Sequence, residues 1–150
     1  MRQGYSLVEL MLTVVIIGVL AMIAVPNFQD MMLKARKSEA ATNLRGIGDS
    51  SVAYFVANDT WVTAATNPGS PIGRTARPWR KGEPGWVNLG WSPDGLVRCT
   101  YMVTAYGSNT WARADAYCDV DDDNDSAIIR YYVPAADREG YFTDLYPSKY

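Results

Sequence analysis

An apolar stretch near the start of the chain constrains the fold more than any other feature. From Leu10 to Val25 there is no charged residue and only one polar side chain, Thr13. Including Leu7 and Val8, the stretch covers 19 positions and encloses one carboxylate, Glu9. At about 1.5 Å of rise per residue, a helix of this length nearly crosses a hydrocarbon layer of about 30 Å. We therefore expect a membrane-spanning helix.

Two common kinds of segment share such a run. A removable secretory signal fits poorly, because only MRQG precedes the pattern and because Ala21 and Ala24 lead into Pro26 and a further helical pattern. A plain single-span anchor fits the length, but it gives no reason for a carboxylate at the edge of the span. Glu9 therefore needs a partner.

The composition argues against an enzyme and against a nucleic-acid-binding protein. The 150 residues include no histidine, the usual general base near neutral pH and the commonest zinc ligand. Cys99 and Cys118 are too few for a structural zinc site, so one disulfide is their simplest use, and it would persist in an oxidising compartment. The net charge of −2 offers no broad cationic surface for a phosphate backbone.

The sequence GYSLVEL, followed by the apolar run, resembles the N-terminus of type IV prepilins. The resemblance implies that a dedicated peptidase cuts between Gly4 and Tyr5 and that the new amino group of Tyr5 is methylated. It also implies that Glu9 acts in assembly, and Gly18 and Pro26 lie where many pilins carry a glycine and a proline. No cofactor follows from it.

The resemblance covers about the first third of the chain and departs from the family in two respects. Tyr5 stands where phenylalanine is usual, and the leader, residues 1–4, is short although it retains Arg2. Pseudopilins of type II secretion systems share the same signature, so major pilin, minor pilin and pseudopilin all stay open.

The charges flanking the span disagree with the orientation that the family implies. Lys34, Arg36 and Lys37 follow the span, whereas Arg2 and the initiating amine precede it, and this count places the C-terminal side in the cytoplasm. The cysteine pair and the resemblance outweigh the count. We therefore expect residues beyond about Phe28 to be periplasmic before assembly.

Helical periodicity continues beyond the apolar run. The apolar face consists of Phe28, Met31, Met32 and Ala35, then Leu44, Ile47, Ser51 and Phe55, and the charged face expected to point away from the core consists of Lys34, Arg36, Lys37, Glu39 and Arg45. The helix is expected to end near Asn58. A helix from Ser6 to Ala57 would be roughly 78 Å long, so lipid or other subunits must bury half of it.

The remainder predicts a long loop and an antiparallel sheet. Residues 61–95 are rich in glycine and proline, and their tryptophans are expected to pin the loop onto the domain. Four basic residues lie close to Trp79 in the sequence: Arg74, Arg77, Arg80 and Lys81. Contact of this pattern with DNA or an anionic surface is a minority interpretation.

Strands are predicted over Leu96–Ala105, Thr110–Cys118 and Ala127–Val133. The tail from Ala135 to Tyr150 is expected to cover a sheet edge.

The run from Cys118 to Asp125, CDVDDDND, is the one candidate metal site. Asp119, Asp121 and Asp123 alternate as in an EF-hand, but Asn124 and Arg130 occupy the positions of the glycine and the bidentate glutamate. The EF-hand interpretation fails. A simpler calcium site stays open, and a solvated hairpin turn without metal is the preferred interpretation.

These features predict an α+β pilin fold: a long N-terminal helix packed on a three- or four-stranded antiparallel sheet, with a long intervening loop and a Cys99–Cys118 disulfide. Its parts are the leader 1–4, the membrane and assembly helix 5–27, the amphipathic helix 28–57, and the loop and sheet 58–150. We expect a structural subunit of a type IV pilus, held in the inner membrane and then polymerised, with other pilin subunits, a prepilin peptidase and assembly machinery as partners. The alternatives are a type II secretion pseudopilin and, more distantly, a membrane-anchored periplasmic binding domain.

Overall fold

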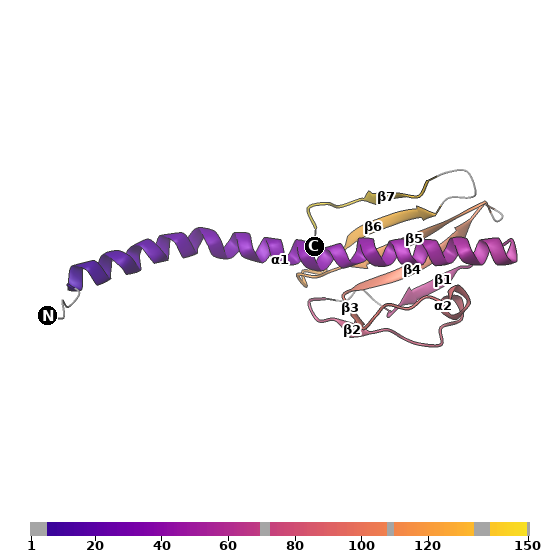
Figure 1. Ribbon diagram of the computed structural model, residues 1–150, viewed down its shortest axis with the longest axis horizontal. Coiled ribbons are helices and arrows are strands. Elements are labelled where there is room, and N and C mark those ends of the chain that lie inside the picture. The colour runs from indigo at the N-terminus through magenta and orange to yellow at the C-terminus, as the bar shows by residue number, and fades with distance from the viewer. Residues whose placement is uncertain (1–5, 70–72, 108–109, 134–138, 150) are drawn as a thin grey trace. The chain divides into compact units, whose positions relative to one another are not determined.

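The computed structural model describes residues 6–69, 73–107, 110–133 and 139–149 (Figure 1). Its elements in chain order are α1 (Leu7–Asn58), β1 (Ala64–Asn67), β2 (Arg77–Pro78), α2 (Pro84–Leu89), β3 (Leu96–Val97), β4 (Cys99–Tyr106), β5 (Trp111–Cys118), β6 (Ala127–Val133) and β7 (Tyr141–Asp144). The chain divides into two compact units, Met1–Lys34 and Ala35–Tyr150. One long N-terminal helix followed by an antiparallel sheet confirms the α+β class.

The first unit contains the apolar part of α1. Among the described residues, α1 is the one helix long and apolar enough to cross a membrane. The Thr13 hydroxyl donates to the Leu10 carbonyl at 2.8 Å, so the polar side chain inside the apolar stretch is satisfied by its own helix, as hydrocarbon surroundings require. The helix continues through Pro26 without a break. The side-chain amide of Asn27, directly after that proline, donates to the Ile23 carbonyl at 3.1 Å.

The buried face of α1 begins later than its periodicity predicts. Phe28 and Met31 are 63% and 68% exposed, whereas Leu44 and Ile47 are fully buried. The prediction is therefore confirmed for the later residues and wrong for the earlier ones within a single chain. The physical reason is that the earlier residues belong to the unit that contains no sheet.

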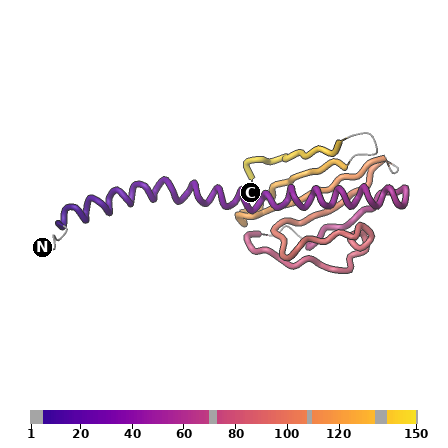
Figure 2. The backbone as a smooth tube through the Cα atoms, in the orientation of Figure 1, coloured from indigo at the N-terminus to yellow at the C-terminus, as the bar shows by residue number. Residues whose placement is uncertain are grey.

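In the second unit, the part of α1 from Ala35 onward lies across a five-stranded antiparallel sheet with the strand order β1-β4-β5-β6-β7 (Figures 1 and 2). The central strand β5 presents Ala112, Ala114 and Ala116 as fully buried side chains. Gly48 is the matching small residue on the helix, because a Cβ atom there would lie 2.2 Å from the Tyr131 ring. Small residues on both surfaces allow the helix and the sheet to pack closely.

The disulfide joins β4 to β5 at the end of their pairing that lies farthest from the Tyr106–Trp111 pair. Cys99 at the start of β4 and Cys118 at the end of β5 are direct cross-strand partners, with Cα atoms 4.4 Å apart. Both cysteines are fully buried. The predicted Cys99–Cys118 bond on neighbouring strands is confirmed.

The sheet has more strands than the sequence indicated. The prediction for β6 agrees with the structure at both ends, whereas the predicted strand Leu96–Ala105 is divided at Arg98 into β3 and β4. The two additional strands, β1 and β7, come from the segments predicted as loop and tail. They form because each pairs with a strand that would otherwise be at the edge of the sheet: β1 pairs with β4, and β7 pairs with β6.

The long segment after α1 includes three short elements, β1, β2 and α2. The sequence did not predict them because the segment is rich in glycine and proline. Asn67 holds this segment together, because its amide donates to the Arg80 carbonyl at 2.9 Å and its side-chain oxygen accepts from the Arg80 N–H at 3.2 Å. Trp86 is buried and donates its indole N–H to the Ala65 carbonyl at 2.8 Å. The expectation that tryptophans pin the segment onto the domain is confirmed for Trp61 and Trp86, which are both buried.

Candidate functional site

The N-terminal site is built from the first turn of α1. The Ser6 N–H donates to Glu9 Oε2 at 2.9 Å, and the Glu9 N–H donates to Ser6 Oγ at 3.2 Å. These two reciprocal bonds form a capping box, in which the side chains satisfy backbone donors that the helix leaves free. The Glu9 carboxylate also lies near the positive end of the helix dipole.

Ser6 is a local partner of Glu9 that the sequence analysis did not identify. The signal was present, because serine followed three positions later by glutamate, directly before an apolar run, is a capping pattern. The partner that Glu9 was predicted to need includes, within the same chain, a residue three positions earlier.

Of the other predicted site residues in this region, the structure describes Gly18 and Pro26. Gly4 and Tyr5 lie outside the described residues. Gly18 is an exposed helical position, where an added Cβ atom would meet nothing within 4 Å in this chain. Pro26 lies inside α1. The roles of Gly4, Tyr5, Glu9, Gly18 and Pro26 therefore stay predictions.

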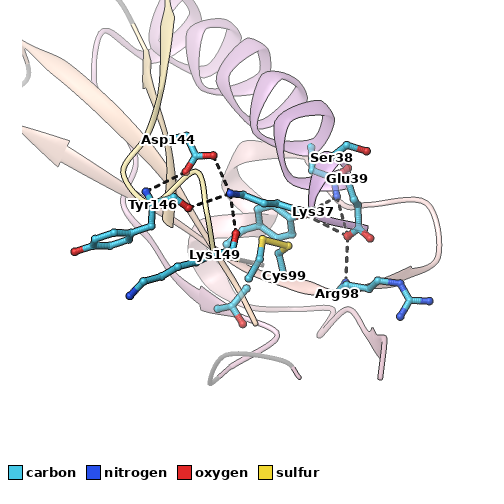
Figure 3. Close-up of a disulfide and its surroundings, with 12 residues drawn as sticks. Lys37, Ser38, Glu39, Arg98, Cys99, Asp144, Tyr146 and Lys149 are labelled. Atoms are coloured by element: carbon cyan, nitrogen blue, oxygen red, sulfur yellow. Dashed lines mark hydrogen bonds and ion pairs between the residues drawn. A yellow bond between two sulfur atoms is a disulfide. The ribbon is translucent and has the colours of Figure 1, made fainter. Parts of the chain in front are cut away.

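Lys37 joins α1 to the C-terminal segment (Figure 3). Its ammonium lies 2.8 Å from Asp144 Oδ2 and donates to the carbonyls of Tyr146 at 3.2 Å and Lys149 at 3.0 Å. The expectation that Lys37 points away from the core is wrong, because the residue is 7% exposed. Burial is tolerated since three oxygens receive the three donors of the ammonium group.

Glu39 also departs from the predicted solvent-facing row. Its Oε1 accepts from the Arg98 N–H at 3.1 Å and from the Tyr101 hydroxyl at 3.3 Å, and Asn43 donates to that hydroxyl at 2.8 Å. Burial, and to a smaller extent the charge of Glu39, raise the pKa of Tyr101. The tyrosine therefore stays a neutral donor that ties the helix to β4.

The aspartate turn, residues 119–125, is the described cluster that could hold a metal ion. Asp119, Asp121 and Asp123 each offer one carboxylate oxygen, and these oxygens lie within 4.8 Å of one another. The turn is also ordered by its own bonds: Asp119 accepts from the N–H groups of Asp122 at 2.9 Å and Asn124 at 3.2 Å. Side-chain acceptance of backbone N–H groups is how aspartate stabilises turns without metal.

Charge repulsion acts within this turn. Burial, followed by the negative charges of Asp123 and Asp119, raises the pKa of Asp121 above its usual range. Asp125 forms an ion pair with Lys149 of the C-terminal segment. The turn thus contacts the tail that Lys37 also holds.

Comparison with known proteins bears on the N-terminal site. Residues 1–25 match the family described as the prokaryotic N-terminal methylation motif. The N-terminus of the chain is thus similar to that of type IV prepilins. The matched residues include Ser6 and Glu9, which form the capping box, and the predicted processing residues Gly4 and Tyr5.

Three relatives point to the same similarity. The chain is 39% identical over 68 residues to a type IV major pilin protein, PilA, of Myxococcus xanthus, over 45% of this chain and 31% of the relative. It is 32% identical over 69 residues to a fimbrial protein of Neisseria meningitidis, over 46% of this chain and 41% of the relative. It is 38% identical over 74 residues to the fimbrial protein EcpC of Eikenella corrodens, over 49% and 47%.

The match to each of these relatives covers less than half of the relative's own length. No solved structure matches the chain. The resemblance to type IV pilins is therefore confirmed through the N-terminal part of the chain, and the pairing of this helix with its sheet rests on the structure described above.

Proposed function

We propose that this chain is a structural subunit of a type IV pilus, a major or minor pilin, that waits in the inner membrane and is then polymerised through its N-terminal helix. One observation supports this most directly. The apolar window of α1 is 0% buried in the single chain, and the matched methylation motif, residues 1–25, includes the start of α1. Exposed apolar surface of this extent requires lipid or other subunits to cover it.

The relatives favour a pilin over a pseudopilin. They are a type IV major pilin protein and two fimbrial proteins. The proposal extends these names to the present chain, places residues beyond about Phe28 in the periplasm before assembly, and takes a prepilin peptidase and an assembly machinery as partners. It includes no catalytic role.

Glu9 is proposed to direct docking. Leaving a charged carboxylate unpaired in apolar surroundings costs on the order of several kcal/mol. The capping bond from Ser6 occupies Glu9 Oε2, and a carboxylate has about four lone-pair sites, so capacity remains for a second donor. That donor is proposed to be the methylated, protonated amine of Tyr5 on another subunit.

The Ser6 cap supplies a matched control for this mechanism. Glu9→Gln and Glu9→Ala should leave membrane insertion and cleavage intact and reduce incorporation into filaments by about tenfold or more, a loss of about 1.4 kcal/mol of docking free energy. Ser6→Ala removes the other half of the capping box and keeps the carboxylate, so it should assemble nearly as well as wild type. The measurement is the ratio of sheared surface protein to membrane-held protein in cells with the variant as the sole copy.

Two outcomes contradict the docking mechanism. Efficient assembly of Glu9→Ala would show that no charge pairing is needed. An equal defect in Ser6→Ala and Glu9→Ala would show that Glu9 serves only to cap its own helix.

A further inference from the structure

A pocket of about 330 Å³ lies in the second unit, on the segment between β1 and β3. Three tryptophans line it, Trp79, Trp86 and Trp91, and Arg80 and Lys81 contribute the charge. Among the described residues no acidic side chain lines the pocket. Its volume lies at the lower end of the range of about 300–1,000 Å³ that is usual for small-ligand sites.

The tryptophans form a corner held in place by the core. The Trp79 ring lies 4.9 Å from Trp86 and 5.3 Å from Trp91, at interplanar angles of 78° and 83°. Trp79 and Trp91 both contact Tyr101, which is fully buried. The rings of Trp79 and Trp91 are half-buried and so keep part of their surface for a ligand. The site is therefore formed before any ligand arrives, which lowers the entropic cost of binding.

The charge of the pocket selects an anion. Arg80 and Lys81 are exposed, and no ion pair holds either of them in the part of the chain that the structure describes. Between residues 73 and 98 there are five basic residues and two acidic ones, a local net charge of +3 in a chain of net charge −2: Arg74, Arg77, Arg80, Lys81 and Arg98 against Glu83 and Asp94. A positive patch on an acidic protein attracts anionic ligands and repels cations.

The ring geometry selects among anions. A nucleobase that inserts between two aromatic rings needs a separation of about 7 Å, twice the contact distance of carbon atoms. The tryptophan centroids are closer than this. The Trp79 ring is nearly perpendicular to the other two rings, and Trp86 and Trp91 are tilted by 46°, so the three rings do not form a parallel ladder on which successive bases could stack. A perpendicular corner instead accepts a puckered ring that presents C–H groups to the aromatic surfaces.

We propose that this pocket binds an acidic sugar ring of the hexuronate kind, a residue of an anionic polysaccharide. The C–H face of the sugar packs against the exposed parts of Trp79 and Trp91. The carboxylate is received by Arg80 and Lys81, the guanidinium being suited to bidentate contact with a carboxylate. The site goes beyond the proposed structural function, because it gives the subunit a ligand of its own.

The test uses the full chain in non-ionic detergent micelles, with tryptophan fluorescence as the readout and trigalacturonate as the probe. Trigalacturonate should change the fluorescence saturably and bind about tenfold or more tightly than uncharged maltotriose. Arg80→Ala/Lys81→Ala should weaken this binding by about tenfold or more. Arg74→Ala/Arg77→Ala removes the same charge from residues that do not line the pocket, so binding should stay within about twofold of wild type.

A second variant keeps the test independent of the basic pair. Val87 lines the pocket and is 61% exposed, so Val87→Glu adds a negative charge there with little effect on folding and should also weaken trigalacturonate binding. Absence of saturable binding by the wild type overturns the proposal. So does an equal loss in both arginine-containing double variants, which indicates diffuse attraction, or binding of oligothymidylate alone, which indicates a nucleic-acid surface.

Discussion

Lys37 shows at the scale of one residue how a charge can be buried in this chain. A lysine among charged neighbours on a helix normally faces solvent, and the sequence around Lys37 is of that kind. In the structure three oxygens of the C-terminal segment surround its ammonium group. None of the three is near in sequence, since the separations of the two carbonyl bonds are 109 and 112 residues.

Replacing Lys37 should therefore loosen the tail. Lys37→Met keeps the aliphatic stem but leaves Asp144 and two carbonyls without their donor, which should lower the free energy of unfolding by about 1–3 kcal/mol. Thermal melts of the full chain in detergent micelles measure this effect. Lys34→Met is the matched control, because Lys34 is exposed. Equal melting temperatures for Lys37→Met and the control would contradict the role assigned to Lys37.

Asp121 gives a second prediction at this scale. Because its pKa is raised in the folded state, the unfolded chain loses this proton first as the pH rises, and the group lowers stability above its folded pKa. Asp121→Asn should therefore raise the stability by a few tenths of a kcal/mol at pH 7 in the presence of a chelator. The gain should vanish near pH 3, where the wild-type side chain is protonated. Melts at the two pH values test the sign.

Calcium gives the same variant a second readout. The bonds from Asp122 and Asn124 to Asp119 order the turn without metal, so a chelator should leave the wild-type melting temperature unchanged. If excess calcium raises the wild-type melting temperature and Asp121→Asn abolishes the increase, the turn is a calcium site and the metal-free interpretation is wrong.

At the scale of elements, β4 and β5 are held together by a covalent bond as well as by their strand pairing. The disulfide joins residues in direct register and closes a loop with a sequence separation of 19. A crosslink of that span lowers the entropy of the unfolded chain by an amount worth about 3 kcal/mol. The register itself follows from the buried alternation of Ala112, Ala114 and Ala116, since a slip by one residue would turn these side chains to the other face.

The Cys99→Ser/Cys118→Ser variant should lose about 3 kcal/mol of unfolding free energy and keep the same fold. Denaturant titration of the exported protein measures the loss, and reduction of the wild type should reproduce it. Thiol labelling of denatured, non-reduced surface material should find no free thiol. Two free thiols in that material would contradict both the bond and the periplasmic orientation.

At the scale of the whole molecule, processing and assembly form one prediction. We expect the mature protein of surface filaments to begin at methylated Tyr5, because the matched motif spans the junction of Gly4 with Tyr5. Intact-mass measurement on sheared filaments decides it. A mature terminus after Ala24 would identify a removable signal instead and would end the pilin interpretation. Gly4→Leu, which puts a bulky residue before the cut, should leave the full-length precursor in the membrane.

The sequence alone determined the features that depend on neighbouring residues. The apolar run of α1, the end of the helix near Asn58, the bounds of β6 and the disulfide partners follow from local composition, from period and from a count of two cysteines. The capping box of Ser6 and Glu9 was equally local and could have been predicted from its spacing.

Only the tertiary structure decided the features that join distant segments. β1 and β7 are four residues each and have no strong alternation, so their strand geometry comes from the hydrogen bonds that β4 and β6 offer at the sheet edges. Lys37 is buried because of carbonyls in a tail more than a hundred residues away. The tryptophan corner likewise forms because Tyr101 of β4 lies beneath Trp79 and Trp91. Local patterns carry periodicity and capping, whereas the partners of a buried charge or of an edge strand depend on which segments the fold brings together.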